Sequence, residues 1–119
     1  MNIQKNEGHD QMAQIPNKIK VTIDQYLKAL KDGNIAIEQA ILFGSYAKGN
    51  YTKYSDIDIA LVSKIFEGSR ITDRNKIRGI TLSISSNLEI LPYHPKDFNT
   101  NDPFVKEILA TGIKIPIKG

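Results

Sequence analysis

The chain lacks residues and segments that several classes of protein require. It contains no cysteine, so disulfide bonds, thiolate metal sites and cysteine nucleophiles are all excluded. No apolar run approaches the ~20 residues that a membrane-spanning helix needs. The first residues show no succession of basic, apolar and small residues of the kind that a secretory signal has. These absences predict a cytoplasmic protein that does not enter a membrane.

A strong charge of one sign is also missing. The net charge is only +3 and the pI is near 9.1. No block of five or more like charges is present, which argues against a nucleic-acid-binding tail and against nucleic acid as the partner. The mildly basic balance suits an anionic ligand such as a nucleotide, but it fits ordinary solubility charge equally well.

The length of 119 residues, of which 40% are hydrophobic, fits one compact domain. Residues 1–14 are polar and aperiodic and are predicted to form a flexible arm, so the domain spans 15–119. Apolar periodicity and turn residues place the secondary structure within it. The predicted helices span 15–32, 45–48, 72–86 and 103–111, and the predicted strands span 39–43, 57–62, 88–92 and 113–115. Their order implies an α/β or α+β fold with one mixed sheet flanked by helices.

The end of the first strand carries the first half of a motif. An apolar run stops abruptly at Gly44, whose missing side chain lets the backbone approach another group closely. Ser45 adds a hydroxyl and a backbone N–H at the start of a predicted short helix, where free N–H groups and partial positive charge favour phosphate. Taken alone, a Gly-Ser pair is most often only a turn.

Two aspartates follow at the start of the next strand. Asp56 and Asp58 are separated by one residue, and side chains alternate across a strand, so both carboxylates project from one face. Ile57 and Ile59 then point to the other face, into the core. Two carboxylates this close repel each other unless a cation lies between them. Such hard oxygen ligands suit Mg²⁺ or Mn²⁺ bound jointly with substrate phosphates. The alternative, a turn followed by a solvated aspartate, is disfavoured by the Gly-Ser pair upstream.

Together these two halves resemble the signature of the nucleotidyltransferases of the DNA polymerase beta superfamily. The segments GSYAKG at 44–49 and SDIDI at 55–59 are similar to its G-S-x-A-[RK]-G and S-D-[IL]-D-[ILV] patterns. Within the superfamily, the chain most resembles the minimal nucleotidyltransferases, prokaryotic domains of about this length. The resemblance extends over nearly the whole chain from residue 15, and its specific part spans 43–61.

The resemblance implies a third carboxylate on a neighbouring strand, and Glu89, flanked by apolar residues at 88–91, is the position that fits. Minimal members often have aspartate here, and Glu89 could instead lie on an exposed sheet face. In the implied chemistry, Asp56, Asp58 and Glu89 bind two Mg²⁺ or Mn²⁺ ions ~4 Å apart. An NMP unit, most often AMP from ATP, passes in line from a nucleoside triphosphate to a hydroxyl acceptor.

The same resemblance assigns the phosphate contacts. Gly44 and Ser45 would hold the β- and γ-phosphates, and Lys48 either adds positive charge there or is an exposed helix lysine. Tyrosines close to the motif could stack on a base, accept a modification or simply pack. These are Tyr46, Tyr51 and Tyr54. His9 and His94 are assigned no role.

The acceptor is the part that the chain itself does not supply, because few residues remain for a second lobe. Either a separate polypeptide brings the acceptor, or a second copy of the chain completes the site. The family likeness favours a small helical HEPN-type toxin, modified on a tyrosine by this chain as its antitoxin. Two alternatives stay open. One is a transferase acting on RNA or on a small molecule such as an aminoglycoside, and the other is a non-catalytic nucleotide-binding antitoxin that acts by binding alone.

Overall fold

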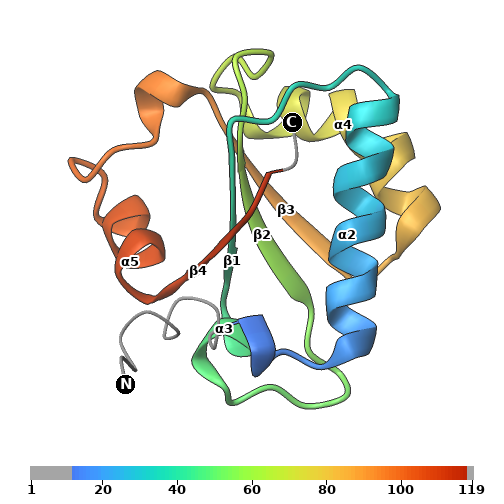
Figure 1. The fold of residues 1–119 in the computed structure, drawn as a ribbon. Helices are drawn as coiled ribbons and strands as arrows, with labels where there is room; N and C mark the ends of the chain where they lie inside the picture. Colours follow the sequence, from blue (N-terminus) through green and yellow to red (C-terminus); the bar gives the residue numbers. More distant parts are fainter. Residues whose placement is uncertain (1–11, 118–119) are drawn as a thin grey trace, which may run out of the picture.

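The computed structural model describes residues 12–117, in which helices and strands alternate as the sequence predicts (Figure 1). Residues 1–11, most of the predicted arm, lie outside the described range; Met12 packs against the core. The helices are α2 (Asn17–Asp32), α3 (Ser45–Lys48), α4 (Arg70–Ile84) and α5 (Pro103–Thr111), with a 3-10 turn, η1 (Pro95–Asp97). The strands are β1 (Gln39–Phe43), β2 (Ile57–Val62), β3 (Leu88–Tyr93) and β4 (Ile113–Ile115).

The four strands form one mixed sheet in the order β3-β2-β1-β4. β1 pairs antiparallel with both β2 and β4, whereas β2 and β3 are parallel. Parallel neighbours need a crossover connection, and α4 provides it. The predicted α+β fold with a mixed sheet flanked by helices is therefore confirmed.

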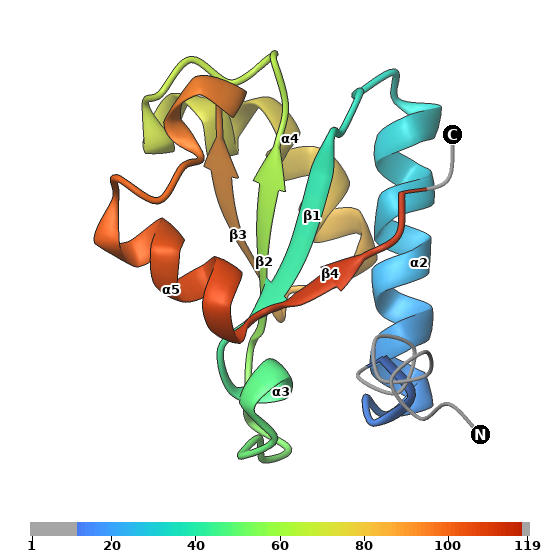
Figure 2. The same cartoon turned by 60° about the vertical axis from the view of Figure 1, so that its left-hand side comes forward.

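Helices cover both faces of this sheet (Figure 2). α2 and α4 pack on one face, where Tyr26 and Ile77 meet buried strand residues such as Ile59. α5 packs on the other face through Val105 and Ile108. Because the sheet is covered on both sides, its strands are apolar almost throughout, and a polar residue within them needs a specific explanation.

Some boundaries differ from the prediction for local reasons. α2 begins at Asn17 because Pro16 occupies the N-cap position, and α4 spans Arg70–Ile84 instead of 72–86. β3 does not end at Pro92 but continues to Tyr93. β3 is an edge strand, and an edge strand accommodates a residue without an N–H group.

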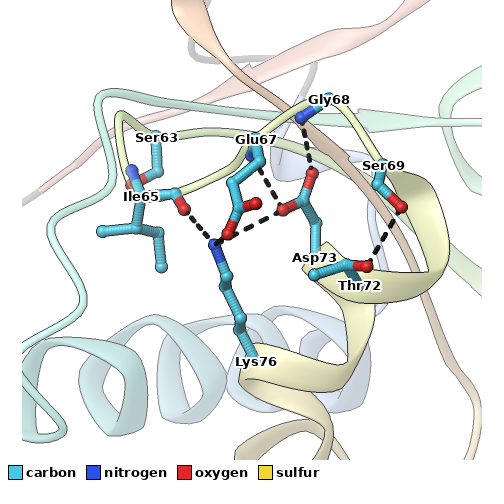
Figure 3. A network of polar contacts seen from close by, with 8 residues as sticks. All are labelled: Ser63, Ile65, Glu67, Gly68, Ser69, Thr72, Asp73 and Lys76. Carbon is cyan, nitrogen blue, oxygen red and sulfur yellow. Dashed lines mark hydrogen bonds and ion pairs between the residues drawn. The ribbon is translucent and has the colours of Figure 1, made fainter.

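The start of α4 is fixed by a buried carboxylate (Figure 3). Asp73 is fully buried and accepts hydrogen bonds from the backbone N–H groups of Glu67 (2.8 Å) and Gly68 (3.0 Å). Lys76, one turn later, donates to the Ile65 carbonyl (2.6 Å) and to the Glu67 carboxylate (2.5 Å). The loop between β2 and α4 is thereby held by the helix it leads into, which sets where α4 lies along the sheet.

No helix within residues 12–117 combines the length and the apolar character needed to cross a membrane. The cytoplasmic location stays a prediction.

Candidate active site

The candidate site lies where β1 ends and β2 begins. Gly44 follows β1 with φ +74° and ψ −151°, a backbone conformation that side-chain-bearing residues rarely adopt. A Cβ atom at this position would overlap the Oδ2 atom of Asp58. The close approach that the sequence predicted for Gly44 is thus confirmed, and its neighbour is the Asp58 carboxylate.

The two aspartates occupy different environments. Asp58 is half-buried on β2, whereas Asp56 is exposed one residue before the strand. Burial, and secondly the negative charge of Asp56, raise the pKa of the Asp58 carboxyl above its ordinary value. Ile57 and Ile59 are buried in the core on the opposite face of the sheet, as alternation along a strand requires. Asp58 therefore remains on the face away from that core, close to a second negative charge.

Sheet register brings Glu89 beside Asp58. The two residues are paired in the parallel β2–β3 ladder, and Phe43 is the partner of Asp58 on β1, so the three lie in one row on one face. The Glu89 side chain is 52% exposed and forms an ion pair with Arg74. The Nε of Arg74 also donates to the Ile90 carbonyl (2.9 Å) at the edge of the sheet.

Arg74 is the residue near this site that sequence reasoning missed, because a lone arginine on a helix carries no motif. Across residues 12–117, no three histidine, aspartate or glutamate side chains are grouped as a cation site. Glu89 is directed to Arg74, and its role as the third metal ligand stays a prediction.

Lys48 and Ser45 lie on α3, which follows directly from Gly44. Ser45 is half-buried as the first residue of this single-turn helix. The Lys48 ammonium lies 3.6 Å from the Glu107 carboxylate of α5, with both side chains about half exposed. Lys48 thus joins α3 to α5 across the side of the site, and its contact with phosphate stays a prediction.

The aromatic and histidine residues divide into packing and exposed groups. Tyr46 is buried and stacks on Tyr51 with ring centroids 4.6 Å apart. Tyr54 is 81% exposed, with the Lys53 ammonium 5.1 Å from its ring centroid. His94 accepts a hydrogen bond from the Lys96 N–H (3.1 Å) and caps η1 beyond the far end of β3. His9 lies outside the described residues.

The geometry at Gly44 yields a substitution test. Gly44→Ala is expected to displace the Asp58 carboxylate and to lower nucleotide transfer by roughly 10²-fold or more, the scale of a misplaced catalytic group. Gly49→Ala is the matched control, because Gly49 also has a positive φ (+83°) but has open space where its Cβ would lie. Gly49→Ala should lose roughly 1–2 kcal/mol of stability, because Gly49 has the left-handed conformation. Gly44→Ala should lose more, because its backbone conformation is nearly restricted to glycine and its Cβ would overlap Asp58. Equal activity of the two variants in a steady-state assay would contradict the proposed contact.

The raised pKa of Asp58 gives a pH-dependent prediction for stability. In the metal-free protein the native state holds the Asp58 proton to a higher pH than the unfolded chain does, so stability decreases as the pH rises through the ordinary aspartate range toward the native pKa. Asp58→Asn removes this cost and is expected to raise the thermal midpoint at pH 7 in EDTA. At pH 3, where Asp58 is protonated in both states, the gain should vanish. A lower midpoint for the variant at pH 7 would show that the carboxylate is not destabilising.

Comparison with known proteins identifies the family. A family model described as "Nucleotidyltransferase domain" matches residues 23–115. The chain is 33% identical over 103 residues to the candidate protein adenylyltransferase MJ1305 of Methanocaldococcus jannaschii, covering 78% of this chain and 67% of the relative. It is 30% identical over 82 residues to a second candidate protein adenylyltransferase of that organism, MJ0141, covering 66% of this chain and 79% of the relative.

Solved structures show the same fold. A crystal structure of a mutant of the toxin–antitoxin pair MntA-HpeT superposes with a TM-score of 0.53 at 20% identity, covering 80% of this chain and 72% of that chain. A second mutant of that pair gives a TM-score of 0.52 at 18% identity, covering 76% of this chain and 69% of that chain. The matched range 23–115 includes both halves of the motif, the Gly44–Asp58 contact and the paired positions Asp58 and Glu89. The chain therefore belongs to the nucleotidyltransferase domain family, in its minimal form, and transfers nucleoside monophosphate units.

Proposed function

We propose that this chain transfers AMP from ATP to a hydroxyl group of a partner protein, with Asp56 and Asp58 as the central catalytic residues. The observation that carries the proposal is the close packing of the Asp58 carboxylate against Gly44, next to the second carboxylate of Asp56. The two halves of the family motif, twelve positions apart in sequence (44 and 56), thereby form one site. The relatives described as candidate protein adenylyltransferases support a protein acceptor and an adenylyl group.

The residues present fit a divalent cation. Burial, and secondly repulsion from Asp56, raise the pKa of Asp58, and a cation between the two carboxylates would favour the charged form of both. Carboxylate oxygens are the ligands that Mg²⁺ and Mn²⁺ prefer, and Mg²⁺ is usually bound by one or two carboxylates together with substrate phosphates. Two such ions, held by Asp56, Asp58 and Glu89, would neutralise charge on the transferring and leaving phosphates.

The other residues of the site have roles in binding and positioning. Gly44 leaves room for Asp58 and, with the backbone of Ser45, offers N–H groups to the outer phosphates of ATP. Lys48 lies within the same turn and adds positive charge at that end of the site. Glu89 contributes a carboxylate to the ions once its ion pair with Arg74 opens. These contacts position the triphosphate for in-line attack, so catalysis consists of alignment and charge stabilisation without a covalent enzyme intermediate.

The proposed acceptor is a tyrosine hydroxyl of a HEPN-type toxin, which makes the chain the antitoxin of a pair. The fold likeness to the toxin–antitoxin protein MntA-HpeT supports this assignment. The hydroxyl oxygen would attack the α-phosphorus, the bond to the β-phosphate oxygen would break, and pyrophosphate would leave. Catalytic modification and neutralisation by binding alone are separable by experiment.

The central test removes the two carboxylates. Asp56→Asn and Asp58→Asn are each expected to lower transfer of label from α-labelled ATP to a purified HEPN-type partner by roughly 10²–10³-fold or more. Asp24→Asn, at an exposed position on α2, makes the same chemical change outside the site and should transfer as the unmodified protein does. Pyrophosphate release gives an independent readout.

The same variants decide between the two antitoxin mechanisms. If the Asp56→Asn/Asp58→Asn double variant still neutralises the toxicity of the partner in cells at full strength, the antitoxin role does not depend on catalysis. Loss of both neutralisation and labelling supports the enzymatic mechanism.

The third ligand has its own test. Glu89→Gln is expected to weaken Mn²⁺ binding about 10–100-fold in the presence of a non-hydrolysable ATP analogue, because it removes one negative oxygen ligand. Electron paramagnetic resonance of free Mn²⁺ measures this without turnover. Glu67→Gln, which also removes an exposed ion-paired glutamate, in the loop after β2, is the control. Unchanged Mn²⁺ affinity in Glu89→Gln would exclude Glu89 as a ligand.

A further inference from the structure

Three arginines form a row along α4, beside the free edge of β3. Arg70, Arg74 and Arg78 are four residues apart, which places them on one side of the helix, one above the other. The single acidic residue of α4, Asp73, is buried and binds two backbone N–H groups. The exposed surface of α4 is therefore cationic over its first two turns and beyond.

Local energetics oppose this arrangement. Positive charge near a helix N-terminus interacts unfavourably with the helix dipole, and Arg70 is the first residue of α4. Like charges four residues apart also destabilise a helix. Of the three, only Arg74 forms an ion pair within residues 12–117, with Glu89. Helix stability does not explain the row. Arg70 lines a neighbouring hollow together with Asp97 and Asp102, and Arg78 has no ion pair within residues 12–117, so a bound anionic group would balance the row.

A groove lies next to the row, between α4 and β3. It has a volume of about 310 Å³, and the apolar side chains of Ile77, Leu88 and Ile90 line it together with Arg74 and Arg78. Leu82, one turn beyond Arg78, is 54% exposed at the same groove. This surface therefore combines an apolar pocket with positive charges at its rim, a combination that suits an amphipathic segment with acidic side chains.

The groove and the candidate active site share one residue, Glu89, at the outer edge of β3. Glu89 is the register partner of Asp58 on the neighbouring strand. Arg74 lies at this shared edge, because it contacts both the Glu89 carboxylate and the Ile90 carbonyl. A chain seated in the groove would consequently contact Glu89, the strand partner of Asp58, at the edge of the sheet.

We propose that the groove and the arginine row dock an acidic segment of the acceptor protein, with an apolar side chain in the pocket and carboxylates facing Arg70 and Arg78. The identification of that protein as the acceptor rests on the proposed function; the docking surface does not. The residues that line the groove include no aromatic side chain, whereas single-stranded nucleic acid is usually bound by stacking on aromatic rings. This composition favours a polypeptide over RNA.

Binding is tested with defined probes in EDTA and without nucleotide. The probe is a fluorescein-labelled 12-residue peptide rich in glutamate with two leucines, compared with the same peptide carrying lysine for glutamate, and with a 12-nucleotide oligouridylate. Fluorescence anisotropy gives the affinities. The acidic peptide is expected to bind, and its affinity should fall with added salt because the interaction is largely electrostatic.

The variants compare equal changes in charge at two places. Arg70→Glu/Arg78→Glu is expected to weaken binding of the acidic peptide about tenfold or more. Lys18→Glu/Lys106→Glu makes the same change in net charge on α2 and α5 and should stay within about twofold of the unmodified protein. Equal losses in both double variants would overturn the proposal, since net charge alone would then explain binding. If oligouridylate binds more tightly than the acidic peptide, and this binding depends on the arginines, the proposed peptide-docking surface is overturned in favour of nucleic acid.

The labelled-ATP assay separates this inference from the proposed function. Arg70→Glu/Arg78→Glu is expected to raise the KM for the protein acceptor about tenfold and to leave kcat unchanged, because neither arginine belongs to the carboxylate site. Transfer with an unchanged KM in this variant would overturn the docking surface and leave the transferase intact. If the acidic peptide binds in an arginine-dependent way but no HEPN-type protein accepts label, the docking surface stands and the proposed function is overturned.

Discussion

The register between β1, β2 and β3 fixes which side chains lie together at the candidate active site. It places Phe43, Asp58 and Glu89 in one row across three strands, on the face away from the core beneath α2 and α4. Side chains alternate with a period of two, so a slip of one residue would turn Asp58 into that core and expose Ile57 or Ile59. Burial of the isoleucines therefore fixes the position of the carboxylate.

The same packing explains why the site tolerates unfavourable electrostatics. Asp58 is half-buried beside Asp56 and pressed against Gly44, an arrangement that costs stability in the absence of a cation. The fully buried residues of β2 and of α2 supply the hydrophobic stabilisation that offsets this cost. A site that is strained when empty binds a cation more favourably, because binding relieves the repulsion.

Much of the fold followed from apolar periodicity, because the strands and helices are short, regular and bounded by strong signals. Asp102 followed by Pro103 is a usual signal for a helix start, and Asp102 does accept hydrogen bonds from the Phe104 and Val105 N–H groups at the start of α5. Pro92 misled the prediction because only the order of strands reveals that β3 is at an edge, where proline is tolerated. The buried Asp73 gave no signal, because its partners are backbone groups of a loop.

From the sequence alone, two motif halves with fixed spacing identify the nucleotidyltransferase domain and predict Gly44, Asp56 and Asp58 as site residues. Only the tertiary structure decided what surrounds them. It set Glu89 beside Asp58, gave that glutamate to Arg74, and aligned α4 with the edge of β3. Asp58 and Glu89 are 31 positions apart in the sequence (58 and 89), and Arg74 and Glu89 are 15 apart (74 and 89). No local pattern encodes these relations, because sheet register and helix packing are settled by burial of the whole core.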